Sequence, residues 1–269
     1  MTRRPLSRTL LALMPPVLLS IGLAEAGLVA TRELLPPGVL DQSSGPVGDY
    51  LQTLGTVYAV LLAFVVFVVW SQFNDARGYV EREANDLVDL YRSARSLPAG
   101  SRGRVQQRLS DYVDGVLERE WAAMACGDER AFEELSQLLD NLWDDLHAAE
   151  PETECERAVH ADMLARFNEL SDARTNRLTS AMLKIPLAMN LLLYAGAVIV
   201  VGSMYLFGVE RAWIHAILTG ALAGALSHVL YLIHDLDSCF SGDWQVPLSA
   251  FQRVQRYIRG HTGGHPVCS

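Results

Sequence analysis

The chain has 269 residues, of which 50% are apolar and 20% are charged, and its formal net charge is −9. This composition is typical of a membrane protein with one sizeable water-facing part. Residues 74–186 hold 23 acidic and 14 basic residues, which is the whole net charge, and the rest of the chain holds 8 of each. The acidic balance argues against nucleic acid as a partner, because nucleic acid binding needs basic patches.

The first apolar stretch covers residues 9–29 and contains one acidic residue, Glu25. The Ala24-Glu25-Ala26 triplet resembles the cleavage site of a signal peptide. Because the apolar run continues past this triplet, we predict a retained membrane span. A carboxylate within a span is a functional hypothesis, although Glu25 lies near the outer end, where it can reach water. Residues 32–49 are rich in Pro and Gly and predict an exposed outer loop.

Three further stretches, residues 50–74, 185–209 and 212–234, contain no Asp, Glu, Lys or Arg. A bilayer core about 30 Å thick needs about 20 residues of helix, so each stretch predicts one span. The last two form a hairpin. Gly220 and Gly224 in the last span predict close helix packing through a small-residue face.

Residues 74–180 show helical periodicity and little strand signal. The apolar pattern predicts a helix that ends before Pro98, one that begins at an N-cap Ser101, a third after residue 128, and a fourth after Pro151 that runs through Met182. The segment 128–156 holds eleven acids and one arginine, Arg130, and is followed directly by Arg157. It is interpreted either as a solvated face or as an acidic collar that attracts cations, with the collar residues Glu152, Glu154 and Glu156.

Basic residues flank the spans on one side, which predicts that both termini and the central segment are cytoplasmic in an inner membrane. The opposite side has only Arg32 and Arg211. All four cysteines are then expected to be reduced. His228 and His234 lie six residues apart on different helix faces, so no metal site is predicted, and neither a cofactor nor a catalytic motif is recognised. The basic residues that flank the spans on the predicted cytoplasmic side are Arg3, Arg4, Arg8, Arg77, Arg82, Arg174, Arg177, Lys184, Arg253, Arg256 and Arg259.

Two short segments carry a family resemblance. The second span contains Leu62-Ala63-Phe64 and is followed by Phe73-Asn74-Asp75-Ala76-Arg77, and the fourth span is followed by Asp237-Ser238-Cys239-Phe240-Ser241-Gly242-Asp243. These segments resemble the bestrophin signature. The chain is more similar to bacterial membrane proteins of unknown function with a bestrophin-like domain, whose pattern also includes Gly55, Tyr58, Glu83-Ala84 and Glu120-Trp121. The signature residues carried over are Asp75, Ala76, Arg77, Asp237, Phe240, Gly242 and Asp243.

The resemblance implies a pentameric ion channel whose second span lines a narrow apolar neck. The neck would be formed by Thr56, Val60, Phe64 and Phe67, and apolar constrictions of this kind gate by dewetting. The alternative is that these side chains face lipid or neighbouring helices. Cys239 replaces the Pro of the tail motif, and residues 244–247 lack the acids that hold calcium in eukaryotic bestrophins, which argues against calcium gating.

We therefore predict an all-α integral membrane protein with four transmembrane helices and a cytoplasmic helical domain inserted between the second and third spans. The predicted function is an oligomeric ion channel that contacts the lipid bilayer and inorganic ions. The alternative is a non-conducting scaffold or sensor that binds a cytoplasmic protein. The predicted parts are residues 1–73 (two spans and the outer loop), 74–184 (cytoplasmic domain), 185–236 (transmembrane hairpin) and 237–269 (cytoplasmic tail).

Overall fold

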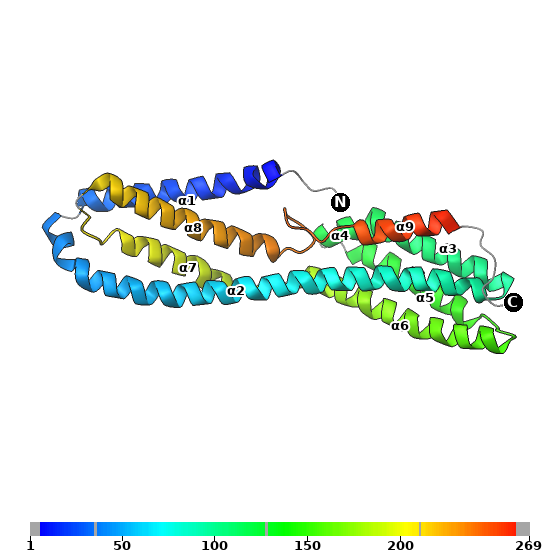
Figure 1. Ribbon diagram of the computed structural model, residues 1–269. Helices are drawn as coiled ribbons and strands as arrows, with labels where there is room; N and C mark the ends of the chain where they lie inside the picture. Colours follow the sequence, from blue (N-terminus) through cyan, green and yellow to red (C-terminus); the bar gives the residue numbers. More distant parts are fainter. Residues whose placement is uncertain (1–5, 35–36, 127–128, 210, 262–269) are drawn as a thin grey trace. The chain divides into compact units, whose positions relative to one another are not determined.

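The computed structural model describes the whole chain except residues 1–5, 35–36, 127–128, 210 and 262–269. The described residues contain helices and no strand, which confirms the all-helical prediction for this part of the chain (Figure 1). The chain divides into two compact units. The first comprises residues 1–71 and 184–237, and the second comprises residues 72–183 and 238–269.

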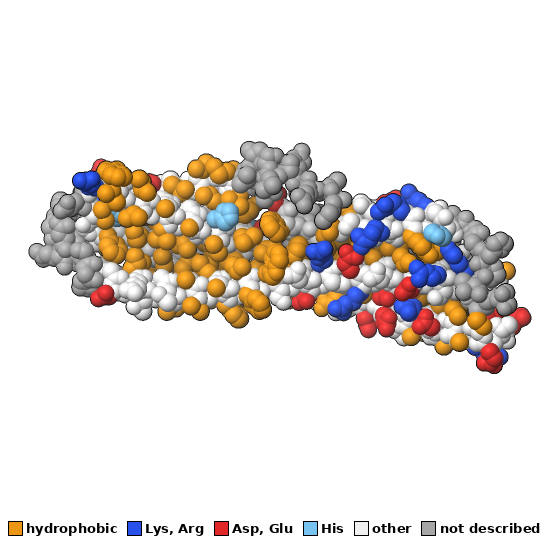
Figure 2. Space-filling model, in the orientation of Figure 1, with side chains coloured by type: hydrophobic (Ala, Val, Ile, Leu, Met, Phe, Trp, Pro, Cys, Tyr) orange, Lys and Arg blue, Asp and Glu red, His pale blue; other side chains and the backbone are white. Residues whose placement is uncertain are grey.

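Four helices of the first unit are long and apolar enough to cross a membrane. They are α1 (Leu6–Leu34), the first part of α2 (Pro37–Ser93), α7 (Leu187–Met204) and α8 (Ala212–Leu236). Each corresponds to one predicted span. At about 1.5 Å per residue, the 18 residues of α7 extend about 27 Å, close to the thickness of a bilayer core. Apolar side chains dominate the visible face of this unit, and we refer to it below as the membrane unit (Figure 2).

The predicted outer loop over residues 32–49 is wrong. The first helix continues to Leu34, and α2 begins at Pro37, so helix covers most of this segment. Proline is well tolerated at the first position of a helix, because its missing N–H would have no partner within the helix there. The Pro and Gly content of the segment therefore misled the prediction.

The second unit contains the end of α2 and seven further segments, all within the described residues. The turn η1 (Ala94–Ser96) leads to α3 (Ala99–Gly115), the π-helical turn η2 (Val116–Glu120) and α4 (Trp121–Cys126). The helices α5 (Glu129–His147), α6 (Glu154–Met182) and α9 (Ser249–His261) complete it. The predicted run of the fourth helix through Met182 is confirmed. The N-cap prediction at Ser101 is wrong, because α3 starts two residues earlier, after Pro98.

The core of the second unit includes side chains from both of its sequence segments. Leu87, Leu109 and Leu135 are fully buried on α2, α3 and α5, and Phe251 of α9 is buried with them. Phe251, Val254 and Ile258 form the apolar face of α9. The tail, treated in the sequence analysis as a separate part, is thus one of the helices that build this unit.

Candidate functional site

The predicted neck residues share one face of α2. At about 100° per residue, Thr56, Val60, Phe64 and Phe67 fall within an arc of about 80°. Val60, Phe64 and Phe67 are 66%, 59% and 69% exposed in the single copy. The buried positions of this part of α2 lie on the opposite side of the helix and are Tyr58, Leu62, Val65 and Val69. The neck face is therefore available to lipid or to other copies of the chain.

The chemistry of this face is apolar for three successive turns. Residues 50–74 carry no charge, and the Thr56 hydroxyl donates to the backbone carbonyl of Gln52 at 2.7 Å. A ring of such faces around an axis would offer water and ions little hydrogen bonding, which is the property of a hydrophobic constriction. The neck assignment stays a prediction.

Opposite the neck face, Tyr58 fixes α2 against α7. Its hydroxyl donates to the carbonyl of Leu193 at 2.6 Å, and its ring lies over Gly196 so closely that a Cβ at this glycine would overlap it. The family pattern noted in the sequence includes Tyr58, and its geometry gives this residue a packing role.

Gly220 and Gly224 lie where α8 meets α1 of the same chain. A Cβ on Gly220 would lie 2.9 Å from Glu25 Oε1, and one on Gly224 would lie 3.2 Å from Ile21 Cδ1. The helices α1 and α8 lie side by side (Figure 1). This small-residue face is thus occupied within one chain.

A buried ion cluster lies at the centre of the second unit. The Arg177 guanidinium donates to both carboxylate oxygens of Glu83, at 2.6 and 2.9 Å, and to Glu120 Oε2 at 2.5 Å. All three side chains are fully buried. Arg174 completes the cluster by donating to Glu120 Oε1 at 2.5 Å. Two arginines and two glutamates leave the cluster without net charge.

Neighbouring groups satisfy and shield these charges. The Tyr112 hydroxyl donates to Glu83 Oε1 at 2.6 Å, and the ring of Phe251 lies 5.5 Å from the Arg177 guanidinium. Burial, reinforced by the charge of Glu83, raises the pKa of Tyr112 well above its ordinary value. Burial by itself would lower the pKa of Arg177, but the two carboxylates outweigh it and raise this pKa well above its ordinary value. The arginine therefore stays charged.

The π-helical turn η2 directs Glu120 into this cluster. An extra residue in the turn re-aims the side chains at its end, and π-turns of this kind are frequent at functional sites. The next residue, Trp121, packs edge to face on Phe240 with ring centroids 5.3 Å apart. Residues from three separate family segments, Glu83, Glu120 and Phe240, thus meet in one part of the second unit.

The sequence reasoning missed this cluster. It noted Glu83 and Glu120 only as members of a family pattern, and it counted Arg174 and Arg177 as basic residues that orient the membrane spans. Both arginines are buried and paired with carboxylates, so neither presents its charge at a membrane surface. No local signal could have joined Glu83 to Arg177, because 94 residues separate them.

The tail signature forms a turn with one position that favours glycine. Gly242 has φ of 87°, in the left-handed region that favours glycine. The N–H of Val246 donates to the carbonyl of Cys239 at 2.9 Å and closes the turn, and Phe240 is buried. Asp243 is half-buried. This geometry explains the glycine and the aromatic of the motif by conformation and packing.

Asp237, assigned to the first unit, anchors the approach to α7. Its carboxylate accepts from the N–H of Ile185 at 2.9 Å, and its backbone carbonyl accepts from Lys184 at 2.8 Å. In the other signature segment, Ala76 is fully buried on α2, whereas Asp75 and Arg77 are exposed. The signature is thus divided between the two units.

Two of the three predicted collar residues have local partners. Thr153 and Glu156 form a capping box, and the Glu156 carboxylate accepts from the N–H groups of Thr153 and Glu152 at the start of α6. These backbone hydrogen bonds lower the pKa of Glu156. Glu154 pairs with Arg157 at 2.7 Å, and Glu152 is exposed. A capping role thus accompanies any attraction of cations by this segment.

Cys155 is disulfide-bonded. The expectation that all four cysteines are reduced is therefore wrong for Cys155. That expectation rested on compartment alone, whereas pairing also depends on how close two sulfur atoms are held. Among the described residues, no three His, Cys, Asp or Glu side chains are grouped to hold a metal ion.

An acidic groove lies between α2 and α6 in the second unit and encloses about 490 Å³. Its wall includes Asp86, Glu169 and Asp172, with Arg82 beside them. Burial, together with the charge of Glu169, raises the pKa of Asp86 to about 6. This carboxylate lies well beyond the uncharged segment 50–74 and titrates closer to neutral pH than an ordinary aspartate.

Comparisons with known proteins agree with this architecture. A family model described as a Bestrophin-like domain matches residues 18–251. A single-site variant of a bacterial Bestrophin homolog from Klebsiella pneumoniae has a similar structure over 92% of this chain and 99% of its own, with a TM-score of 0.72 and 15% identity.

A second crystal structure of the Klebsiella pneumoniae homolog covers 93% of this chain and 98% of its own, with a TM-score of 0.68 and 16% identity. A variant described only as a membrane protein covers 95% and 100%, with a TM-score of 0.71 and 16% identity. No curated protein matches the chain. At these identities the solved structures establish a shared fold.

Proposed function

The chain belongs to the bestrophin-like family, and from that membership we propose that it forms a homo-oligomeric ion channel in the inner membrane. The observation that carries this proposal is the neck face of α2. Val60, Phe64 and Phe67 are largely exposed in the single copy, although aromatic and aliphatic side chains in one row are well suited to packing. Five copies around an axis would turn these faces toward one another and enclose a narrow apolar passage.

The charge distribution supports a preference for cations. In the proposed orientation the second unit is cytoplasmic, and the net charge of −9 resides in residues 74–186. Five copies would surround the cytoplasmic mouth with a strongly negative field, which raises the local concentration of cations. Glu152 and Glu154 are the collar positions whose neutralisation would test this effect without removing the Glu156 cap.

Conductance of purified protein in planar bilayers tests the neck directly. Phe64→Ala removes a large apolar side chain from each copy, so the dewetting barrier falls and the conductance should rise. The matched control is Leu191→Ala on α7, a similarly exposed apolar side chain in the membrane unit but away from α2. This control should leave the conductance at the wild-type level.

The competing function is a non-conducting scaffold or sensor that binds a cytoplasmic protein. Absence of current from both wild type and Phe64→Ala, with the oligomer intact in cross-linking, would favour this alternative. A strictly monomeric particle would also remove the central passage, because one copy has no axis to line. Equal increases in conductance for Phe64→Ala and Leu191→Ala would contradict the neck assignment alone.

A further inference from the structure

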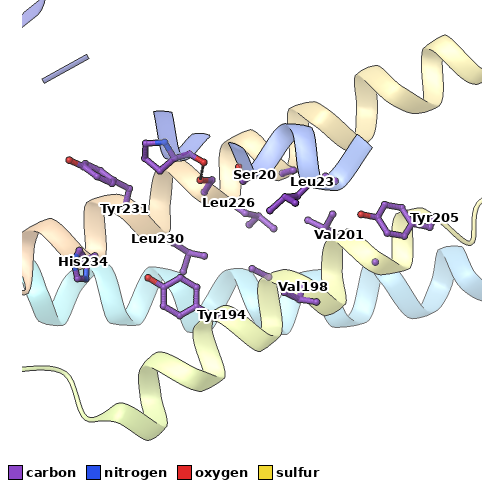
Figure 3. A pocket seen from close by; sticks show the side chains of 16 residues that line it. Ser20, Leu23, Tyr194, Val198, Val201, Tyr205, Leu226, Leu230, Tyr231 and His234 are labelled. Atoms are coloured by element: carbon purple, nitrogen blue, oxygen red, sulfur yellow. Dashed lines mark hydrogen bonds between the residues drawn. The ribbon is translucent and has the colours of Figure 1, made fainter. Parts of the chain in front are cut away.

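The membrane unit contains an apolar cavity of about 430 Å³ between α1, α7 and α8 (Figure 3). Leu23, Val198 and Leu230 are among its walls, and none of its lining residues is Asp, Glu, Lys or Arg. Rings of side chains that select ions use Asp and Glu for cations and Arg and Lys for anions. The cavity has none of these side chains, so a group that selects ions by charge has to be sought elsewhere in this unit.

The neck face of α2 continues beyond Thr56 with two polar side chains, Asp49 and Thr53. At about 100° per residue, both fall within the same arc of about 80° that contains the neck residues. Asp49, Thr53 and Thr56 are all exposed in the single copy. Asp49 lies seven residues before Thr56, which is about 10 Å along the helix. The face is thus acidic at this end, carries hydroxyls next, and is apolar from Val60 to Phe67.

The hydroxyl hydrogens of both threonines are used within α2. Thr53 Oγ1 donates to the backbone carbonyl of Asp49 at 3.0 Å, and Thr56 Oγ1 donates to that of Gln52 at 2.7 Å. A hydroxyl group has one donor and two acceptor lone pairs, so each oxygen keeps only acceptor capacity toward a passing ion. Hard cations are bound by oxygen lone pairs, whereas an anion needs donors. These two hydroxyls therefore favour cations.

The carboxylate of Asp49 adds a negative charge at the same place. Asp49 is the one charged residue between residues 48 and 74. In the described part of the chain, no lysine or arginine forms an ion pair with it. Arg32 of α1 is engaged elsewhere, because its guanidinium lies 2.5 Å from the carbonyl of Val209 and 3.1 Å from His215 Nδ1. One such carboxylate from each copy of an oligomer would form a negative ring at the entrance to the neck.

We propose that Asp49, Thr53 and Thr56 form an outer vestibule of the passage and select small inorganic cations, such as K⁺, before they reach the apolar neck. The ring of carboxylates raises the local concentration of cations, and the hydroxyl oxygens replace part of their hydration shell. Because one chain has no axis for these side chains to surround, the outer vestibule rests on the proposed function. It selects cations at the end of the span away from residue 74, in addition to the acidic field of the second unit.

The test is the reversal potential of the purified protein in planar bilayers under a KCl gradient, which gives the permeability of K⁺ relative to Cl⁻. Asp49→Asn removes the charge and keeps the size of the side chain, so this ratio should fall about tenfold. Asp49→Glu keeps the charge and should keep the wild-type ratio. Glu33→Gln is the matched control, because Glu33 is an exposed acid of the same unit on α1. Its ratio should equal that of wild type.

The contribution of the hydroxyls is measured separately with Thr53→Val, which keeps the branched shape and removes the oxygen. The K⁺ conductance should fall about fivefold, as expected for the loss of one favourable polar contact. Thr31→Val on α1 is the matched control, because the Thr31 hydroxyl also donates to a carbonyl of its own helix, that of Gly27, at 2.8 Å. This control should keep the wild-type conductance.

Four results would overturn the outer vestibule. Current from wild type and Phe64→Ala with an unchanged ratio in Asp49→Asn would remove it and leave the proposed function standing. Equal losses in Asp49→Glu and Asp49→Asn would show an effect of shape instead of charge. If Asp49→Asn fails to assemble, wild-type conductance in Thr53→Val decides against the vestibule. Absence of current from wild type would overturn the proposed function and the vestibule together.

Discussion

The two units of the chain join their helices by different means. In the membrane unit the helices meet at glycines and backbone carbonyls, as where Tyr58 covers Gly196 and where α1 approaches Gly220. In the second unit a fully buried group of charges links α2, η2 and α6. Lipid tails are as apolar as leucine, so helices in a bilayer gain from close approach instead of from leaving water. In the second unit an apolar core already forms. The buried charges are paired only when α2, η2 and α6 are in one arrangement, so they select that arrangement.

The largest effect is expected from breaking the ion cluster. Arg177→Ala leaves Glu83 and Glu120 buried without their cation, which should cost about 3–5 kcal/mol of stability. The measurement is thermal unfolding of the detergent-purified protein. Arg166→Ala on the same helix is the control, since its pairs with Asp89 and Asp162 are partly exposed and should contribute about 1 kcal/mol or less. Equal losses for the two variants would show that the cluster adds nothing beyond a surface pair.

A smaller effect, in the membrane unit, should follow from one added methyl group. Gly196→Ala forces the Tyr58 ring away from α7 and should destabilise the protein by about 1–3 kcal/mol. Gly202→Ala, six residues along the same helix, meets nothing within 4 Å. This second change should stabilise by about 0.5–1 kcal/mol, because glycine is unfavourable within a helix. Unfolding midpoints that move in the same direction would contradict the close packing of α2 on α7.

The smallest effect concerns the acidic groove of the second unit. The folded pKa of Asp86 is raised from 3.8 to about 6, so folding favours its protonated form. The resulting stability is fully present below the unfolded pKa and is lost as the pH rises through about 6. Because this group is only partly buried, we expect about 1 kcal/mol or less. Asp86→Asn should reduce the dependence of the unfolding midpoint on pH between pH 4 and 7. Glu118→Gln, at an exposed site, should keep the wild-type dependence.

The parts of the fold that could be predicted are those with a strong local signal. The three uncharged stretches predicted three spans correctly, because an apolar run of more than 20 residues without charge is long enough to cross a bilayer core and is typical of a membrane span. The signal failed at residues 32–49, since Pro and Gly content does not distinguish a loop from a helix that starts with proline. At Thr153 and Glu156 a capping box was present in the sequence, but the acid count around it favoured the collar interpretation.

The candidate site also has features that could be predicted from local sequence and features that could not. The neck face of α2 follows from helical periodicity, so its shared orientation could be predicted from spacing alone. The ion cluster could not, since Glu83 and Arg177 belong to helices far apart in sequence and Glu120 depends on a π-turn without a recognisable signature. The cavity between α1, α7 and α8 also depends on how three helices fit together, and no single segment encodes it.

The interrupted sequence of the second unit has a consequence for biosynthesis. Arg177 is made before the last two spans, but Phe251, whose ring covers it, follows them by many residues. At about 5–20 residues per second, the 74 residues between them take about 4–15 seconds to translate. During this interval the paired charges lack one of their covers while α7 and α8 are being inserted. Folding of the second unit therefore cannot be completed before the last two spans have been made, and the ribosome sets the order of the two events.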